Sequence, residues 1–174
     1  MNIGESLPRN VQHFADKRAI VDAQRTVTYG ELHERTNRLA NYLLDRGIGK
    51  GDLVGISVGS RAEHFEALFA LAKIGAILVT ANTSLRAKDI DYVLRQSEAA
   101  TLVTIRGFRD VDYVVELEKA GARPSVGHLK RIIYIGAETP EGFTPFEDLR
   151  RLADRVPDAD LDARGRAVGV DDVI

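Results

Sequence analysis

The chain has 174 residues, with 24 Lys and Arg against 26 Asp and Glu, a formal net charge of −2, and neither Cys nor Trp. The lack of Cys excludes disulfides, thiolate metal sites and a thiol nucleophile. The near-neutral charge gives no concentrated basic surface for nucleic acid or an anionic membrane. The length indicates a single domain that can bury a hydrophobic core.

No apolar run is long enough for a secretory signal or a membrane span. Glu5 and Arg9 interrupt the first fourteen residues, and the apolar stretch Ile77-Leu78-Val79 after Gly75 is short. We therefore expect a cytoplasmic protein without a membrane-spanning segment.

The amino-terminal part predicts a hairpin and then a helix. Ala19-Ile20-Val21 and Thr26-Val27 flank a polar turn, which favours a small β-hairpin. Thr28 and Glu31 have the spacing of a capping box, and apolar residues then recur at helical spacing as far as Gly47. This pattern predicts a helix over 29–46 that Gly47 ends.

Strands and helices then alternate along the chain. Runs of apolar and β-branched residues predict strands at 53–58, 77–80, 101–105 and 131–135. Between them we expect a helix capped by Ser60 and Glu63 and ended by Gly75, and further helices near 87–97 and 111–119. Strands joined by helices imply parallel neighbours, so the predicted fold class is α/β, a doubly wound mainly parallel sheet with flanking helices.

The last part of the chain changes in composition. Thr144 and Glu147 have capping-box spacing, with Pro145 expected at the first helical position of a short helix that ends at Leu152. Asp, Arg, Pro and Gly predominate after Val156, which is typical of a mobile linker.

An apolar run that resembles the start of a strand closes the chain. It covers 168–174 and follows the polar stretch directly. We therefore expect an α/β subdomain over 1–156, and an acidic linker with the start of the next strand over 157–174.

One pentapeptide matches a catalytic motif. Gly55-Ile56-Ser57-Val58-Gly59 fits the G-x-S-x-G nucleophile elbow and lies between a predicted strand and a predicted helix. A hydrolase also needs an acid and a distant His after Ser57, and only His64 and His128 follow. The alternative interpretation is that Gly55 and Ser57 are small residues inside a tightly packed central strand.

The glycine-rich stretch Gly47-Ile48-Gly49-Lys50-Gly51 has the wrong context for a phosphate loop. It follows a predicted helix and precedes a predicted strand, whereas a phosphate cradle requires a strand, a loop and then a helix. We interpret it as a helix cap and turn, with Lys50 in solvent.

The titratable residues indicate no metal site. The four His residues lie in separate predicted elements without metal-ligand spacing, and we expect them at the surface or in packing: His13, His33, His64 and His128. The carboxylate pairs are expected to be solvated or to cap helices: Asp110 with Asp112, and Asp171 with Asp172. We therefore assign no catalytic residue and no metal ligand.

The polar segment Thr80-Ala81-Asn82-Thr83-Ser84 follows a predicted buried strand. Open α/β sheets bind ligands at such positions. The simpler interpretation is that these residues hydrogen-bond within a turn.

Two longer segments carry a family resemblance. Val27-Thr28-Tyr29-Gly30-Glu31-Leu32 resembles the first core motif of the AMP-forming acyl-CoA synthetases, with Val27 in place of the usual Leu. The second motif of that adenylate-forming superfamily resembles residues 71–82, where Thr80 replaces the usual Pro. Between them, Gly47 through Asp52 resembles a G-[IV]-x-x-G-D turn of the superfamily. Ser60-Arg61-Ala62-Glu63 resembles its N-R-x-E segment, with Ser60 in place of Asn.

Three later stretches resemble a narrower group. They are 96–101, 107–113 and 128–136, which look like those of bacterial ligases for medium-chain or alicyclic acids, of the cyclohexanecarboxylate–CoA ligase type.

The resemblance implies a reaction in two half-steps. A carboxylate attacks ATP in the presence of Mg²⁺ to give acyl-adenylate and pyrophosphate, and CoA then displaces AMP. Asp171-Asp172-Val173-Ile174 resembles the strand that leads into the family's phosphate loop, and that loop does not occur in the chain. No catalytic residue of the family can therefore be placed on this sequence, and we expect no tight binding of ATP, Mg²⁺ or CoA by this chain alone.

Three hypotheses follow for the function. The chain is the leading part of an acid–CoA ligase and inactive alone, or a non-catalytic α/β module that binds a ligand or partner, or a small serine hydrolase that uses Ser57. In the first case we expect it to dock onto the remainder of the synthetase, or to self-associate through exposed apolar surface.

Overall fold

The structure, a computed structural model, describes residues 2–22, 25–124, 128–151, 158–169 and 171–174. Its contacts divide the chain into two compact units. The helical unit comprises Met1–Gly51, Ser60–Ile77 and Leu149–Ile174, and the sheet unit comprises Asp52–Gly59 and Leu78–Asp148. The described residues include no helix that is long and apolar enough to cross a membrane.

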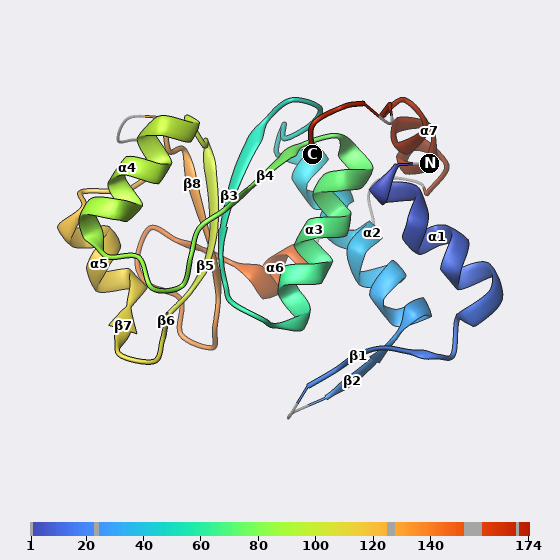
Figure 1. The fold of residues 1–174 in the computed structure, drawn as a ribbon, viewed down its shortest axis with the longest axis horizontal. Helices are drawn as coiled ribbons and strands as arrows, with labels where there is room; N and C mark the ends of the chain where they lie inside the picture. The colour runs from blue at the N-terminus through green and yellow to red at the C-terminus, as the bar shows by residue number, and fades with distance from the viewer. Residues whose placement is uncertain (1, 23–24, 125–127, 152–157, 170) are drawn as a thin grey trace. The chain divides into compact units, whose positions relative to one another are not determined.

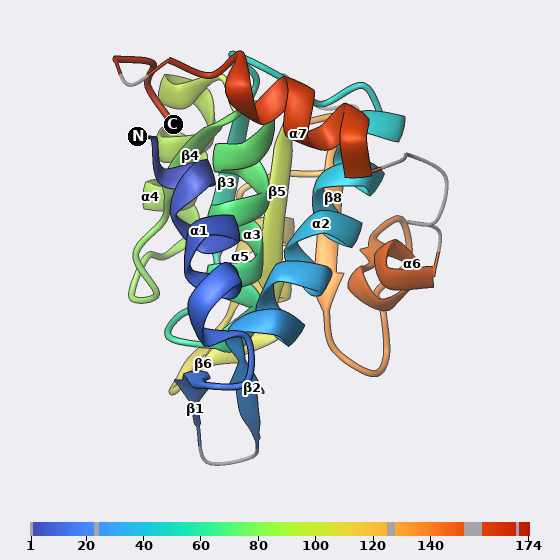
Figure 2. The ribbon, with the colours of Figure 1, turned by 90° about the vertical axis from the view of Figure 1, so that its right-hand side faces the viewer.

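The helical unit contains four helices and one hairpin among its described residues (Figure 1). They are α1 (Ile3–Phe14), β1 (Arg18–Val21), β2 (Thr26–Thr28), α2 (Tyr29–Asp45), α3 (Ala62–Ile74) and α7 (Asp158–Arg166). Helices α1, α2 and α3 lie side by side, and α7 contacts all three (Figure 2).

The start of the helical unit confirms two sequence predictions. Strands β1 and β2 form the expected antiparallel hairpin. The side chain of Thr28 accepts a hydrogen bond from the backbone of Glu31, and the Glu31 side chain accepts one from the backbone of Thr28. Helix α2 then ends before Gly47, whose φ of 75° is the left-handed conformation that glycine adopts most easily.

Helix α1 was not predicted from the sequence. Asn2 and Glu5 form a capping box at its start, whereas Pro8 lies inside the helix. A proline inside a helix removes a backbone donor, so the apolar spacing here is a weak helix signal. The N-x-x-E spacing of Asn2 and Glu5 is the signal that could have revealed it.

The predicted cap of α3 is wrong. The residue before the helix is Arg61, which makes no side-chain cap, and Glu63 turns toward other partners. The predicted end is correct, since Gly75 takes a φ of 71° there. On this helix Phe65 is 40% exposed, whereas Glu66 and Lys73 are buried.

Helix α7 occupies nine residues of the segment 157–174, where a linker and the start of a strand were expected. Helix α7 forms because its unit provides tertiary contacts, and such contacts override a polar composition. Leu161 and Val168 are buried, and the side chain of Asn2 donates hydrogen bonds to the carbonyl groups of Gly165 and Val168. The described residues after Val168 form a turn rather than the expected strand.

The sheet unit confirms the predicted α/β class. Its five-stranded sheet has the order β4 (Ile77–Thr80), β3 (Leu53–Ser57), β5 (Thr101–Ile105), β8 (Arg131–Ile135), β9 (Thr144–Pro145). The pairs β3–β5, β5–β8 and β8–β9 are parallel. Helices α4 (Ala87–Ser97) and α5 (Tyr113–Lys119) pack against each other, and their apolar residues join those of β5 and β8 in one buried cluster.

Two helix starts in the sheet unit differ from the predictions. Residues 111–112 belong to β7 (Val111–Asp112), which pairs with β6 (Gly107–Phe108), so α5 begins at Tyr113. Pro145 lies in β9, and α6 (Phe146–Arg151) begins after it rather than at it. Leu152, the predicted last residue of this helix, lies outside the described residues.

Candidate ligand-binding edge of the sheet

The strand order places a topological switch point between β3 and β5. From β3 the chain passes to β4 on one side and returns to β5 on the other. In open α/β sheets, ligands bind outside the carboxyl ends of the strands at such a point. The last residues of the two strands are Ser57 and Ile105, and Ala81 donates a backbone hydrogen bond to Ile56 at the same edge.

The segment Thr80–Ser84 at this edge forms a tight turn. The Oδ1 atom of Asn82 accepts hydrogen bonds from the backbone N–H of Ser84 at 2.9 Å and from its hydroxyl at 2.8 Å. The hydroxyl of Tyr113 donates to the carbonyl oxygen of Thr83 at 2.6 Å. These contacts agree with the interpretation of the segment as a hydrogen-bonded turn.

Two further contacts attach the start of α4 to the segment that begins α5. Arg86 Nη2 lies 2.8 Å from Asp110 Oδ2, and the backbone N–H of Ala87 donates to Glu116 Oε2 at 2.8 Å. The hydrogen bond from Arg86 holds the pKa of Asp110 below its ordinary value. Contacts of Thr83, Arg86 and Ala87 with Tyr113, Asp110 and Glu116 therefore hold the loop after β4 against the segment 110–116.

Ser57 does not form a nucleophile elbow. It is the last residue of β3, it is buried, and it pairs with Thr104 of β5. An elbow would instead expose the serine on a sharp turn between strand and helix. His128 precedes the amino end of β8, whereas Ser57 lies at the carboxyl end of a strand in the same parallel sheet, so the two residues lie at opposite edges. The structure favours the interpretation of Gly55 and Ser57 as small strand residues.

Lys50 is exposed to solvent, as expected, and it also forms an ion pair. Its Nζ lies 2.6 Å from Asp172 Oδ2, and Asp172 also accepts a hydrogen bond from the backbone of Gly169. The hydrogen bond from Lys50 is the main reason that the pKa of Asp172 lies below its ordinary value. The glycine-rich stretch forms the expected turn, in which Gly51 donates to the carbonyl of Gly75.

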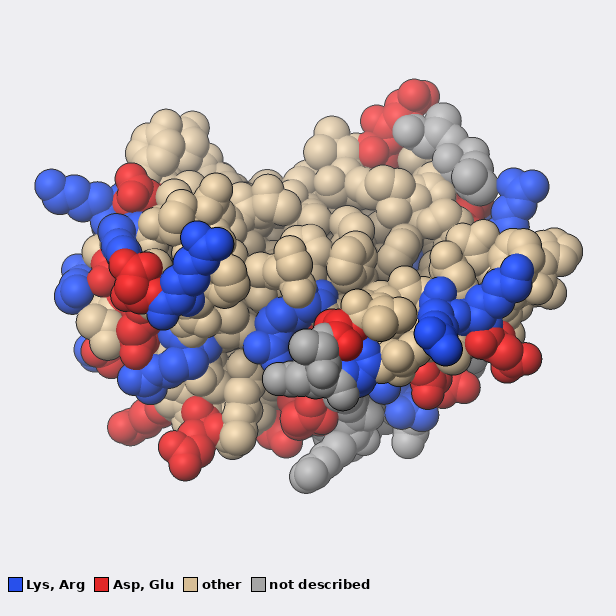
Figure 3. All heavy atoms as spheres, turned by 60° about the horizontal axis from the view of Figure 1, so that its bottom comes forward, with Lys and Arg blue, Asp and Glu red and all other residues tan. Residues whose placement is uncertain are grey.

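The other candidate residues lie apart from one another. Histidines occur on α1 (His13), α2 (His33), α3 (His64) and before β8 (His128), and burial lowers the pKa of His64. Asp112 caps α5 by accepting a hydrogen bond from the backbone of Val115, as a capping role predicts. The part of the chain that the structure describes contains no group of three or more His, Asp or Glu that could hold a metal ion. Basic and acidic side chains are intermixed on the face shown in Figure 3.

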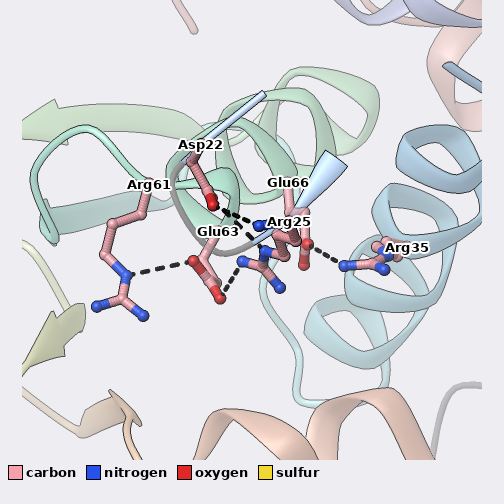
Figure 4. A network of polar contacts seen from close by, with 6 residues as sticks. All are labelled: Asp22, Arg25, Arg35, Arg61, Glu63 and Glu66. Atoms are coloured by element: carbon pink, nitrogen blue, oxygen red, sulfur yellow. Dashed lines mark hydrogen bonds and ion pairs between the residues drawn. The ribbon is translucent and has the colours of Figure 1, made fainter. Parts of the chain in front are cut away.

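Sequence reasoning missed an ion-pair network around two buried glutamates in the helical unit (Figure 4). Arg25 from the hairpin turn and Arg61 both contact Glu63, and Arg25 also contacts Asp22. Arg35 of α2 lies 3.4 Å from Glu66. The side chains of Glu63 and Glu66 are 7% and 1% exposed. Their spacing of three residues on α3, beside small alanines, is the signal that could have identified a buried charged face.

Burial alone would raise the pKa of Glu63, because it penalises the charged form. Hydrogen bonds from the backbone and from Arg25, together with the charges of Arg25 and Arg61, outweigh burial and bring the pKa below its ordinary value. Glu63 is therefore charged at neutral pH, and the network is a set of paired charges rather than a proton-transfer site.

Comparison with known proteins decides the family. The model of the AMP-binding enzyme family matches residues 7–164. The chain belongs to the AMP-binding enzyme family. It is 36% identical to YngI of Bacillus subtilis (strain 168), named as an acyl-CoA synthetase, over 99% of this chain and 34% of that protein. It is 28% identical to the 3-oxocholest-4-en-26-oate–CoA ligase of Rhodococcus rhodochrous, over 94% of this chain and 29% of that protein.

Solved structures of family members share the fold. The anthranilate CoA ligase AuaEII, in complex with anthranoyl-AMP, matches with a TM-score of 0.79 and 27% identity, over 88% of this chain and 28% of that one. A long-chain-fatty-acid CoA ligase from Rhodopseudomonas palustris matches with a TM-score of 0.76 and 30% identity, over 90% of this chain and 37% of that one. The family member described here thus spans about a third of the length of the curated relatives it matches.

Proposed function

We propose that this chain is part of an AMP-forming acid–CoA ligase and supplies α/β scaffold without the reacting groups. The observation that carries the proposal is the match to the AMP-binding enzyme family over nearly all of the chain, with relatives named as acid–CoA ligases. The complete enzyme would convert a carboxylate, ATP and CoA to acyl-CoA, AMP and pyrophosphate. Since ATP and CoA are cytoplasmic metabolites, this proposal also places the protein in the cytoplasm.

Lys50 and the polar residues of the Thr80–Ser84 turn make their contacts within this chain. Lys50 pairs with Asp172, and Asn82 and Ser84 bond within their own turn. Adenylation depends on clamping polyphosphate charge and holding the acid in line for attack. We therefore propose that ATP, Mg²⁺ and CoA act in the complete enzyme and that none binds tightly to this chain alone.

The activity test is acid-dependent exchange of labelled pyrophosphate into ATP. It compares the pure 174-residue chain with the native polypeptide that contains it, each with a panel of medium-chain, alicyclic and aromatic acids. We expect exchange from the native polypeptide if it is longer, and none from the chain alone. Exchange by the pure chain would show that it carries the reacting groups, whereas a longer polypeptide without exchange on any acid would favour a non-catalytic binding module.

The mass of the native polypeptide tests whether a longer ligase exists. An antibody against this segment, used on an extract of the source cells, should detect a species several times heavier than 19.1 kDa. A native species of 19.1 kDa would mean that the remainder of a ligase, if any, is a separate chain. Co-purification with a second polypeptide of the same family would then distinguish a split enzyme from an independent module.

We propose the free edge of β4 as the place where this chain docks onto the remainder of the ligase. β4 is at one end of the strand order, and its Ile77, Leu78 and Val79 are only half-buried. The strand carries neither a charge nor a proline, the devices that protect sheet edges from pairing. Without the remainder, the same edge should drive self-association.

Sedimentation of the pure chain over a range of concentrations tests the edge. We expect concentration-dependent oligomers that Leu78→Lys weakens, because a charge at the edge opposes strand pairing. The matched control is Val21→Lys, which places the same charge on an exposed valine of β1. A monomer at every concentration, or equal effects of the two substitutions, would contradict the assignment of this edge.

A further inference from the structure

A pocket lies in the helical unit where α1, α3 and α7 contact one another (Figure 2). Its volume is about 360 Å³, within the range of about 300–1,000 Å³ that small-molecule sites occupy. A cavity of about 150 Å³ already holds a molecule as large as benzene, so this pocket has room for a ligand of several non-hydrogen atoms.

Two glycines bring α1 and α7 close to the backbone of α3 beside the pocket. A Cβ atom at Gly4 would lie 3.0 Å from the carbonyl oxygen of Ala72 and 3.1 Å from the Cα atom of Lys73. A Cβ atom at Gly165 of α7 would lie 3.7 Å from the carbonyl oxygen of Lys73. Both glycines and Lys73 line the pocket, so α1 and α7 form its walls where they approach α3.

The described side chains of the pocket carry more positive than negative charge. Arg9 of α1, Lys73 of α3 and Arg166 of α7 are cationic, and Glu5 is the one carboxylate among the described lining residues. Glu5 accepts a hydrogen bond from the backbone of Asn2 at 3.2 Å, as part of the capping box of α1. Positive charge therefore reaches the pocket from three helices, whereas the carboxylate serves the start of α1.

The cationic side chains have the donors that an oxyanion requires. Lys73 is 3% exposed and donates a hydrogen bond to the amide oxygen of Asn37, and its ammonium group has three N–H donors. Arg9 and Arg166 are exposed, and a guanidinium has five N–H donors in a planar fork that fits two oxygens of a carboxylate or phosphate. A contact within the protein therefore does not use up the donors of these side chains.

We propose that this pocket binds a small oxyanion, a carboxylate or a phosphate, between α1 and α7. Arg9 and Arg166 hold the oxygen atoms from the two walls, and Lys73 adds a buried positive charge that water screens little. Pro8 and Leu161 provide apolar surface for the body of the ligand. The proposal does not depend on the ligase function.

Titrations of the full 174-residue chain with inorganic phosphate and with butyrate test the site, followed by amide NMR at constant ionic strength. We expect saturable shifts of the amide signals of Gly4, Lys73 and Gly165, and the probe that binds more tightly identifies the oxyanion as phosphate or carboxylate. Arg166→Met should weaken this binding by about fivefold or more, because it removes a charged fork from one wall.

The matched control is Arg164→Met. It removes the same charge from an exposed residue in the last turn of α7 that does not line the pocket, so affinity should stay within about twofold of wild type. Equal weakening by the two substitutions would overturn the proposal, because it would indicate a general attraction of anions to the basic end of α7.

Arg9→Met gives a second reading from the opposite wall and guards against misfolding of Arg166→Met. It should also weaken binding of the tighter probe, while the midpoint of denaturant unfolding shows whether each variant is folded. Folded variants at Arg9 and Arg166 that both bind as wild type does would overturn the proposal. The absence of saturable shifts with both probes at millimolar concentrations would overturn it as well.

Discussion

The two units of this chain differ in what they bury beside their apolar cores. In the sheet unit, aliphatic side chains of α4, α5, β5 and β8 form the buried cluster. The helical unit also has an apolar cluster, which includes Leu32 of α2 and Ala62 of α3, but there Glu66 and Lys73 are almost fully buried as well. Lys73 donates a hydrogen bond to the amide oxygen of Asn37 on α2, and Arg35 of α2 pairs with Glu66. The hydrophobic effect does not depend on how the buried groups are oriented, whereas a buried charge requires an oppositely charged or hydrogen-bonding partner.

Truncation of an apolar core residue should give the largest effect. Ile132 is fully buried in β8, so Ile132→Ala should lower the free energy of unfolding by about 3 kcal/mol through lost transfer energy and a new cavity. Hydrogen exchange of individual amides locates the loss, which should appear in β5 and β8. Equal loss of protection in α2 and α3 would show that the two units unfold together and are not energetically distinct.

Removal of one charge from the ion-pair network around Glu63 should lower the free energy of unfolding by a smaller amount. Glu63→Gln leaves Arg25 without its carboxylate partner, but the Arg25 side chain is 30% exposed and can be hydrated, so we expect a loss of about 1–2 kcal/mol. Exchange should accelerate in α3 and in the hairpin. Arg25→Met in the Glu63→Gln background is the control, because it should restore part of the loss; no restoration would mean that the pair is not coupled.

The free energy of unfolding of wild type and of Glu63→Gln, compared at several pH values, distinguishes a charge effect from a packing effect. Because the folded pKa of Glu63 is lowered, its charge stabilises the folded state above the unfolded pKa near 4.5, and that stability is lost as pH falls through the folded pKa. The difference in free energy of unfolding between wild type and Glu63→Gln should therefore be constant near neutral pH and shrink below about pH 4.5. A gap that stays constant down to unfolding would indicate packing alone.

An exposed ion pair should have the smallest effect. Asp110 is largely in solvent, and its pair with Arg86 is screened by water. Arg86→Met should leave the midpoint of denaturant unfolding unchanged within error, in contrast to Glu63→Gln. A clear shift of that midpoint would mean that the loop after β4 depends on this pair rather than on Tyr113.

The same contrast explains what the sequence could predict. Strands β3, β4, β5 and β8 and the helix over 29–46 follow from apolar periodicity and from the cap at Thr28. The buried face of α3 does not, because Glu66 and Lys73 look like solvent-facing residues until partners from α2 are known. Helix α7 was missed for a related reason, since Leu161 and Val168 are buried only through contacts distant in sequence.

The sequence predicted where the candidate ligand-binding edge of the sheet lies, but not which contacts form it. The Thr80–Ser84 turn after a buried strand was expected, and it agrees with the simpler interpretation. The switch point was not expected, because it depends on the strand order β4-β3-β5, and the burial of Ser57 depends on its pairing with β5. A linear pattern such as G-x-S-x-G contains neither piece of information.

The most direct test of the proposed function is acid-dependent ATP–pyrophosphate exchange by the purified 174-residue chain. If the chain is ligase scaffold without the reacting groups, no exchange above background should appear with any acid, whatever the concentration of ATP and Mg²⁺. Exchange that depends on an added carboxylic acid and rises in proportion to the pure chain would contradict that claim.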